Sequence, residues 1–342
     1  MAREKIRAAI LGYGRSGSTM HADALAGNAD DFDVVAVCDI DAGRRKEAAE
    51  RFGCPTYAEY PKMLSTERPD LVSVITRSDQ HAAMTVDCLE AGANVLVTKP
   101  WAVNADEARG MVDAADRAGR TLLPWLPARW GADLARLREL LAKDAVGKVF
   151  FVRRTVCSFG LRNDWQTRRR HGGGYLLNWG PHIVDPPLLL LGGQAASVFG
   201  RLRRVMNPGD AEDTFFAMIT LADGRLVQAE YAVAVRGLHG WFVQGDRGTI
   251  ILDGNRLRLY PYEPKMPDDP TRYQGMKPSD LEPVTEELPG GMSGDPVGIY
   301  AEAAHALRGE RPFPVTPRDA LELSRVLDAI RTSSDEDRVV AM

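Results

Sequence analysis

The chain has no long hydrophobic run, no excess of positive charge and no clustered cysteines. Its densest apolar stretch, "LLLLGG", is far shorter than the roughly 18 to 20 residues that a membrane-spanning helix needs. Lysine and arginine number 43 against 47 aspartates and glutamates, a formal net charge of −4. We therefore expect neither membrane insertion nor a nucleic-acid partner.

The four cysteines are widely spaced and form no C-x-x-C motif; they are Cys38, Cys54, Cys88 and Cys157. This spacing predicts reduced, partly buried thiols rather than a metal or redox centre. The start of the chain, "MAREKIRAAILGYG", passes from a short charged segment straight into a strand-like run, without the apolar stretch of a signal peptide. We expect a cytoplasmic protein.

The 342 residues exceed the size at which a single core keeps growing, so the length predicts two domains. Residues 1–123 alternate short apolar runs with helical patterns, as in "DVVAVCD", "AGRRKEAAERFG" and "LVSVIT". Continuous apolar strands between helices are typical of a parallel sheet that is covered on both faces. The first domain is therefore predicted to be α/β.

Residues 124–342 have a different pattern. Segments such as "TFFAMITLADGRLVQAEYAVAV" and "GWFVQGDRGTIILDG" alternate apolar and polar residues, and "ADGRL" and "GDRGT" are hairpin signals. The stretch 261–296, rich in proline, glycine and aspartate, predicts a surface excursion, and two amphipathic helices close the chain. This part is predicted to be an α+β domain with a large open, mainly antiparallel sheet.

The motif "GYGRSG" follows the first apolar run and places glycines at 12, 14 and 17. In a G-x-G-x-x-G turn the first glycine makes the turn, the second admits the pyrophosphate and the third lets the helix approach the strand. Asp39 ends the next strand, at the distance where an acidic residue binds the adenosine ribose. We predict an NAD-binding Rossmann domain whose cofactor loop comprises Gly12, Tyr13, Gly14, Arg15, Ser16 and Gly17. The alternative is a glycine turn in which Asp39 only caps a helix.

The choice between NAD and NADP depends on charges near Asp39. This carboxylate would repel a 2'-phosphate, which favours NAD. Arg44 and Arg45 begin the following helix and could pair with that phosphate, so NADP is not excluded. Alternatively, the two arginines are a solvated first turn.

A second group of polar residues lies further along the chain. Lys99 ends a predicted parallel strand, where open α/β sheets bind their ligands, although most lysines are simply exposed. Asn178, His182 and Asp185 are spaced i, i+4, i+7, which predicts one face of a single helix. His182 could instead be a hydrogen-bonded core residue, and a metal site is disfavoured because spacing supplies no third ligand.

Three motifs together resemble the glucose-fructose oxidoreductase / inositol dehydrogenase (Gfo/Idh/MocA) family: "AILGYGRSGSTMH", "ITRSDQHAAMTVDCLEAGANVLVTKP" and "GGGYLLNWGPHIVD". The resemblance covers nearly the whole chain. It implies a Rossmann domain followed by a domain whose open sheet often forms an oligomer interface. It also implies that Lys99 contacts substrate and assists proton movement, that His182 is the general base, and that Thr76 and His81 lie near the nicotinamide.

The chain departs from the family pattern at three positions. Thr98 replaces a glutamate before Lys99, and Arg77 stands where proline is common. Asn178 replaces an aspartate, and an amide cannot supply the negative charge that favours a protonated His182.

These observations predict an NAD-dependent oxidoreductase of a sugar or cyclic polyol, acting as a homodimer or homotetramer. His182 would take the hydroxyl proton, Lys99 would polarise the forming carbonyl and Asn178 would orient the hydroxyl. Candidate substrate contacts are Trp101, Arg129 and Trp165, each of which could equally be a packing residue. Alternatives are an enzyme that retains NAD and cleaves or epimerises glycosides through transient oxidation, and a non-enzymatic sensor of sugars or nucleotides.

Overall fold

The computed structural model describes residues 4–269, 271–273 and 281–342. Throughout these ranges, each helix is too short or too polar to cross a membrane. The residues group into two compact units. The first unit contains 1–127, 164–178 and 295–328, and the second contains 128–163, 179–294 and 329–342. The division at residue 123 remains a prediction, because both units include segments from beyond it.

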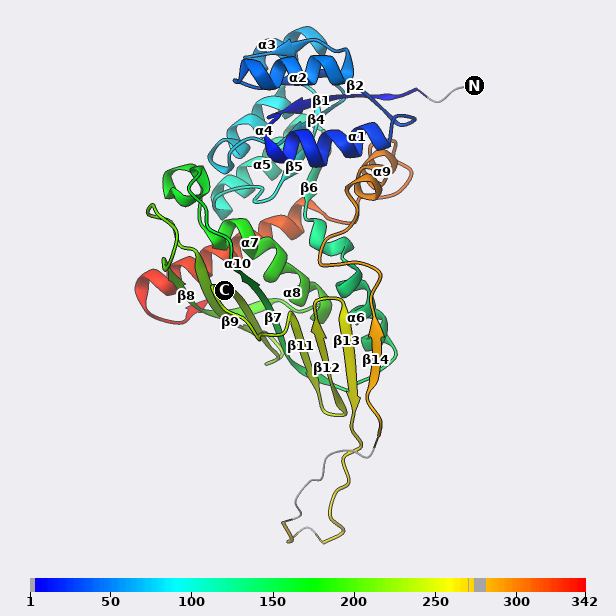
Figure 1. Cartoon of the computed structure of the whole chain (residues 1–342), viewed down its shortest axis with the longest axis vertical. Coiled ribbons are helices and arrows are strands. Elements are labelled where there is room, and N and C mark those ends of the chain that lie inside the picture. The colour runs from blue at the N-terminus through cyan, green and yellow to red at the C-terminus, as the bar shows by residue number, and fades with distance from the viewer. Residues whose placement is uncertain (1–3, 270, 274–280) are drawn as a thin grey trace. The chain divides into compact units, whose positions relative to one another are not determined.

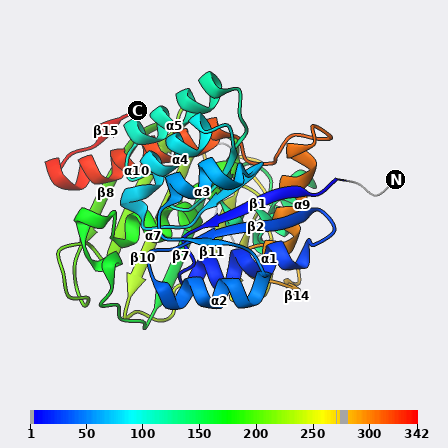
Figure 2. The same cartoon turned by 90° about the horizontal axis from the view of Figure 1, so that it is seen from above.

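The first unit is built on a parallel sheet of six strands in the order β3-β2-β1-β4-β5-β6 (Figure 1). Helices α1 and α2 lie over one face of the sheet, and α4 and α5 lie over the other (Figure 2). Both faces are covered, which explains why β1 and β4 are buried almost throughout. The strands are β1 (Ile6–Leu11), β2 (Phe32–Cys38), β3 (Thr56–Tyr57), β4 (Leu71–Val74), β5 (Asn94–Thr98) and β6 (Leu122–Trp125).

Helix ends in this unit follow local chemistry. The side chains of Asp41 and Asn104 accept hydrogen bonds from backbone N–H groups at the starts of α2 and α5. Gly53 and Gly119 end the same helices in left-handed conformations. The helices are α1 (Ala22–Gly27), α2 (Ala42–Phe52), α3 (Tyr60–Glu67), α4 (His81–Glu90), α5 (Ala105–Ala118) and α9 (Pro296–Leu307), with short turns η1 (Gly17–His21), η2 (Ser78–Gln80), η4 (Trp165–Thr167) and η5 (Arg169–His171).

The second unit contains a sheet of nine strands in the order β14-β13-β12-β11-β7-β10-β9-β8-β15. Every neighbouring pair is antiparallel except β10 and β7, and the two predicted hairpins join β9 to β10 and β11 to β12. Together with the first sheet, this confirms the predicted fold class. The strands are β7 (Val149–Ser158), β8 (Ala195–Arg203), β9 (Thr214–Leu221), β10 (Leu226–Val233), β11 (Trp241–Gly245), β12 (Gly248–Asp253), β13 (Arg256–Pro261), β14 (Val284–Glu287) and β15 (Val340–Ala341).

Strand β9 shows why this sheet has two different faces. Phe215, Ala217, Ile219 and Leu221 are buried, and the residues between them are half-buried. Such alternation is expected of a sheet with one face against a core. The helices α6 (Ala132–Ala142) and α8 (Asp185–Leu191) accompany it, while η3 (Pro127–Trp130), α7 (Tyr175–Ile183) and α10 (Pro317–Glu336) carry residues of both units.

One local prediction is wrong. The helix expected to present residues 178, 182 and 185 together ends at Ile183, and Asp185 begins α8 instead. Pro186 and Pro187 explain the break, since proline lacks the N–H that would continue the preceding helix and is favoured in a first turn. The described residues of the predicted surface excursion 261–296 are exposed or half-buried except Leu288, and they include the short strand β14. Residues 270 and 274–280 lie outside the described ranges.

The cysteines are free thiols. Burial raises the pKa of Cys38 to about 11 and that of Cys88 to about 12, so both stay protonated at neutral pH.

Candidate functional site

The glycine loop between β1 and η1 fits a dinucleotide at each of its three glycines. Gly12 has φ +99°, and a Cβ there would lie 2.6 Å from the Ile75 carbonyl oxygen. A Cβ on Gly17 would lie 2.1 Å from the Gly12 carbonyl oxygen, so only glycine lets the first turn approach the strand. A Cβ on Gly14 would meet nothing nearer than the Arg44 guanidinium, at 3.7 Å. The loop therefore leaves space beside Gly14, where the backbone can approach a pyrophosphate.

Asp39 supports this loop from the end of β2. Its side chain is buried, and its two oxygens accept from the Tyr13 N–H at 2.7 Å and from the Asp41 N–H at 2.8 Å. The Asp39 carboxylate thus holds the cofactor loop in place. Each carboxylate oxygen has a further lone pair that a ribose hydroxyl could use.

The two neighbouring arginines differ. Arg45 donates to the carbonyl oxygens of Asp39 and Ile40, at 2.8 and 3.0 Å, and so braces the end of β2. The Arg44 side chain is 50% exposed and lies 3.7 Å from the Asp39 carboxylate and beside Gly14. Of the pair, Arg44 is the one positioned to meet a cofactor phosphate.

On the other side of the glycine loop, His81 joins two predicted site segments. Its Nδ1 lies 2.7 Å from the Pro100 carbonyl oxygen, and its Nε2 lies 3.0 Å from that of Thr76. Burial lowers the pKa of His81, while the two carbonyl acceptors act in the opposite direction. His81 therefore fixes the end of β4 against the residues that follow Lys99.

Lys99 is held by Asn178. Its Nζ donates to the Asn178 carbonyl oxygen at 2.9 Å and to the Asn178 Oδ1 at 2.7 Å. Lys99 ends β5 and Asn178 lies in the first turns of α7, where its N–H donates to the Gly174 carbonyl oxygen. The Asn178 side-chain oxygen thus orients the lysine, whereas the sequence had suggested that it orients a substrate hydroxyl.

In the second unit, His182 is 8% exposed and its ring centroid lies 5.7 Å from that of Trp179. Trp179 in turn stacks on Tyr231 at 5.1 Å, so aromatic packing fixes one side of the imidazole. Arg129 forms a bidentate pair with Asp185, in which the Arg129 Nε and Nη2 donate at 2.8 and 2.7 Å. Both side chains of this pair are buried.

Two residues predicted to contact the substrate, Trp101 and Trp165, lie in the first unit. Trp101 is 4% exposed, and its indole N–H donates to the Ser324 hydroxyl at 3.0 Å. Trp165 lies half-buried in η4. In the first unit the structure thus brings together Thr76, His81, Lys99 and Asn178; in the second it places Arg129 beside Asp185 and His182 beside Trp179. The roles assigned to all these residues remain predictions.

A buried network that no sequence motif indicated joins η1, β4 and α9 in the first unit. His21 Nδ1 lies 3.0 Å from the Tyr300 hydroxyl, which lies 2.7 Å from the Ser73 hydroxyl. Burial lowers the pKa of His21 to about 3, so the imidazole is neutral. Helix α9, which carries Tyr300, lies beside α1 (Figures 1 and 2). No sequence spacing could show this contact, because residues 21 and 300 are far apart in the chain.

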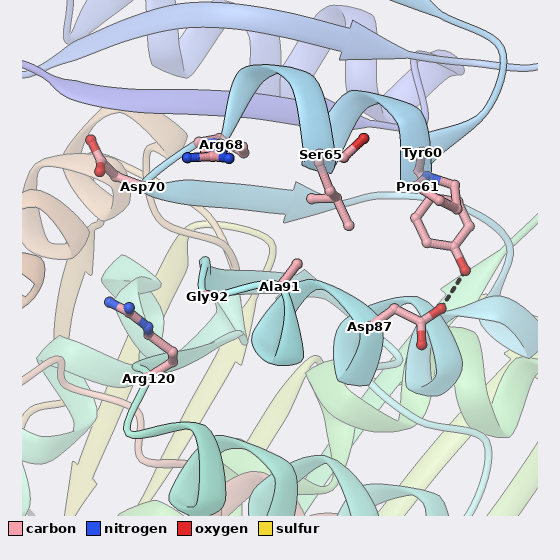
Figure 3. Close-up of a pocket in the computed structure, with 11 residues that line it drawn as sticks. Tyr60, Pro61, Ser65, Arg68, Asp70, Asp87, Ala91, Gly92 and Arg120 are labelled. Atoms are coloured by element: carbon pink, nitrogen blue, oxygen red, sulfur yellow. Dashed lines mark hydrogen bonds between the residues drawn. The ribbon is translucent and has the colours of Figure 1, made fainter.

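A shallow hollow of about 630 Å³ opens elsewhere on the first unit (Figure 3). Asp70, Gly92 and Arg120 line it just before β4, β5 and β6 begin. It therefore lies at the amino ends of the strands, the opposite edge from the glycine loop and Lys99. Ligands of open α/β sheets bind at the carboxyl ends, so this hollow is not the cofactor site.

Within the described part of the chain, histidine, cysteine, aspartate and glutamate side chains form no group of three or more that could hold a metal ion.

Comparison with known proteins places these features in a family. Residues 6–124 match the oxidoreductase family with the NAD-binding Rossmann fold, and residues 134–251 match the GFO/IDH/MocA C-terminal domain. The chain is 25% identical over 355 residues to scyllo-inositol 2-dehydrogenase (NADP(+)) IolW from Bacillus subtilis, with 99% of this chain and 96% of IolW covered.

Solved structures of other proteins have the same fold. An NAD-binding protein from Listeria innocua is 27% identical with a TM-score of 0.83, covering 99% of this chain and 97% of its own. The WlbA dehydrogenase from Chromobacterium violaceum, solved with NADH and UDP-GlcNAcA, is 25% identical with a TM-score of 0.82, covering 100% and 97%. The glycine loop, the two sheets and these matches lead to one assignment: the chain belongs to the Gfo/Idh/MocA family and is an oxidoreductase with an NAD-binding Rossmann domain.

Proposed function

We propose that this oxidoreductase uses NAD to oxidise a carbinol group of a sugar or cyclic polyol. The observation that carries the proposal is the position of Lys99, whose Nζ is held by Asn178 at the same edge of the sheet as the glycine loop. Two relatives support the substrate class by their names, since one is a scyllo-inositol dehydrogenase and another was solved with a nucleotide sugar.

The bound nicotinamide supplies hydride acceptance, and the chain supplies positioning and charge. The Lys99 ammonium stabilises the negative charge that develops on the carbinol oxygen as its proton leaves. His182 accepts that hydroxyl proton. Asn178 keeps the lysine in place through a neutral oxygen, so that the ammonium charge is not cancelled by a neighbouring carboxylate.

The test is a panel of sugars and inositols added to purified protein with NAD or NADP, with NADH or NADPH formation followed by absorbance. We expect at least one sugar or inositol to be oxidised by the native protein and not by a Lys99→Ala variant. Turnover that Lys99→Ala leaves unchanged would remove the lysine from the mechanism. If no member of the panel reduces either cofactor, the proposed reaction is wrong.

We also propose a homodimer or homotetramer formed through the outer face of the nine-stranded sheet. Phe151, Phe216 and Phe242 are only half-buried there, and the Arg153 guanidinium lies over the Phe242 ring at 5.4 Å. Aromatic side chains on an open sheet face are buried further when a second subunit covers that face. Light scattering at micromolar concentration should show at least a dimer, and a monomer would contradict the proposal. The cytoplasmic location remains a prediction from the sequence.

A further inference from the structure

A run of arginines and glycines, "RRRHGGG" at 168–174, is held firmly against the turn η2. Gly172 has φ +65°, and a Cβ there would lie 2.7 Å from the Ser78 Cβ and 2.6 Å from a Val103 methyl group. A Cβ on Gly173 would lie 2.5 Å from the Gln166 carbonyl oxygen. These glycines therefore allow the arginine-bearing turn η5 to pack directly on η2, which follows β4.

Polar contacts join the two turns. Asp79 accepts hydrogen bonds from the Arg77 Nε and Nη2, both at 3.2 Å, and lies 3.3 Å from the His171 Nδ1. Arg170 Nε donates to the His171 Nε2 at 3.2 Å. His171 therefore lies between the Asp79 carboxylate and the Arg170 guanidinium. One carboxylate thus anchors Arg77 and, through His171, Arg170.

Arginines outnumber acidic residues in the two turns. Residues 77–80 and 164–171 contain four arginines against two aspartates, Asp79 and Asp164. The Arg168 side chain is exposed, and no acceptor for it occurs within residues 4–269, 271–273 and 281–342. We define the arginine cluster as Arg77, Arg168, Arg169 and Arg170. Guanidinium groups match the paired oxygens of a carboxylate or phosphate.

The arginine cluster adjoins the groups that hold Lys99. Arg77 follows Thr76, whose carbonyl contacts the same His81 that contacts the carbonyl of Pro100, next to Lys99. The glycine run leads directly into α7, where the Asn178 N–H bonds to the Gly174 carbonyl oxygen. All of these residues belong to the first unit.

The cofactor does not account for this charge. The glycine loop after β1 fits the pyrophosphate, and Asp39 and Arg44 mark the adenosine end after β2. The arginine cluster follows β4, on the other side of β1 in the sheet, where a dinucleotide places its nicotinamide end. The nicotinamide ring carries no anionic group. An anion bound at this position would therefore belong to the second substrate.

We propose that the arginine cluster binds an anionic group of the substrate, a carboxylate or a phosphate, so that the substrate is an acidic or phosphorylated sugar or polyol. This inference rests on the proposed function, because it names the substrate class of the same site.

The first experiment needs no turnover. NADH-loaded protein is titrated calorimetrically with inorganic phosphate at constant ionic strength. We expect saturable binding that Arg168→Gln weakens at least tenfold. Because the Arg168 side chain makes no hydrogen bond to the described residues, this variant should fold normally.

The matched control is Arg120→Gln. It removes another exposed arginine, from the hollow at the opposite edge of the sheet (Figure 3), and should bind phosphate as the native protein does. Absent phosphate binding, or binding that Arg168→Gln leaves unchanged, overturns the inference.

The second experiment assigns the site to the substrate. Aldoses are compared with their uronates and 6-phosphates by kcat/KM. The acidic member should be preferred at least about 30-fold, and Arg168→Gln should remove that preference by raising KM without changing kcat or the Kd of NADH. A preference for the neutral sugar, or a weaker affinity for NADH in Arg168→Gln, overturns the substrate role even if phosphate binds. If no sugar is oxidised, the proposed function fails, and the phosphate titration still decides whether the anion site exists.

Discussion

The two sides of the first unit's binding edge use charged residues differently. On the β2 side, the Asp39 carboxylate and the Arg45 guanidinium bond to the backbone, and Arg44 remains half-exposed. On the β4 and β5 side, an amide orients Lys99, and Arg168 extends to solvent. Charges on the first side mainly shape the loop that binds the cofactor. We infer that charges on the second side contact the substrate. Their contribution to stability then depends on whether the substrate is bound.

The largest effect should come from Lys99. Lys99→Ala should lower kcat at least about 100-fold, because it removes the positive charge beside the developing alkoxide. His182→Ala should cause a similar loss by removing the base. The Kd of NAD should change little in both, since neither side chain supports the glycine loop. Lys46→Ala, at an exposed lysine of α2, is the control. Near-native turnover in either site variant would show that its residue takes no part in the reaction.

The buried His21 gives a prediction for stability. The pKa of His21 falls from 6.5 to about 3 on folding, so below pH 6.5 only the unfolded chain takes up this proton. The free energy of unfolding should therefore decrease as the pH falls from 6.5 toward 3, by up to about 1.4 kcal/mol per pH unit.

Urea unfolding at several pH values can isolate this contribution. His21→Phe should flatten the pH dependence between pH 6.5 and 4.5, since it removes the titrating group. Equal slopes in native protein and His21→Phe would show that other groups cause the acid destabilisation.

On the β2 side, substitutions of Arg44 and Arg45 should have smaller effects that differ from each other. Arg44→Ala should weaken NADP binding about tenfold and NAD binding much less, the loss expected for one charge-assisted contact to the 2'-phosphate. Arg45→Ala should instead reduce thermal stability and leave the ratio of the two affinities unchanged, because Arg45 bonds to backbone carbonyls. Calorimetric titration of both variants with both cofactors measures this. A ratio that moves with Arg45 but not with Arg44 would reverse the assignment.

The smallest expected effect tests Asn178. Asn178→Asp places a carboxylate on Lys99 and one helical turn before His182, and a negative charge favours the protonated form of both. The acidic limb of the kcat/KM profile should shift upward by about one pH unit, because the base then holds its proton to higher pH. An active variant with an unshifted limb would show that residue 178 does not couple to the base. In that case Asp185 is a poor candidate for the group that sets the basicity of His182, because its carboxylate is paired with Arg129.

Local pattern was sufficient for the features that depend on nearby residues. The three glycines, the apolar strands and the hairpin signals predicted the cofactor loop, the parallel sheet and the antiparallel sheet. Each of these follows from short-range sterics and from periodic burial, so a single sequence carries the information. The family resemblance extended this to Lys99 and His182 as expectations.

Tertiary structure decided which partner each polar group has. The sequence could propose that Arg44, Arg45 and Arg129 bind ligands, but only the fold shows that Arg45 braces β2 and that Arg129 pairs with Asp185. It likewise brings Asn178 to Lys99, His171 to Asp79 and Tyr300 to His21. These partners are between 79 and 279 residues apart in the chain. Hydrogen bonds and ion pairs act over a few ångströms in space, and chain spacing holds no record of which distant residues folding brings that close.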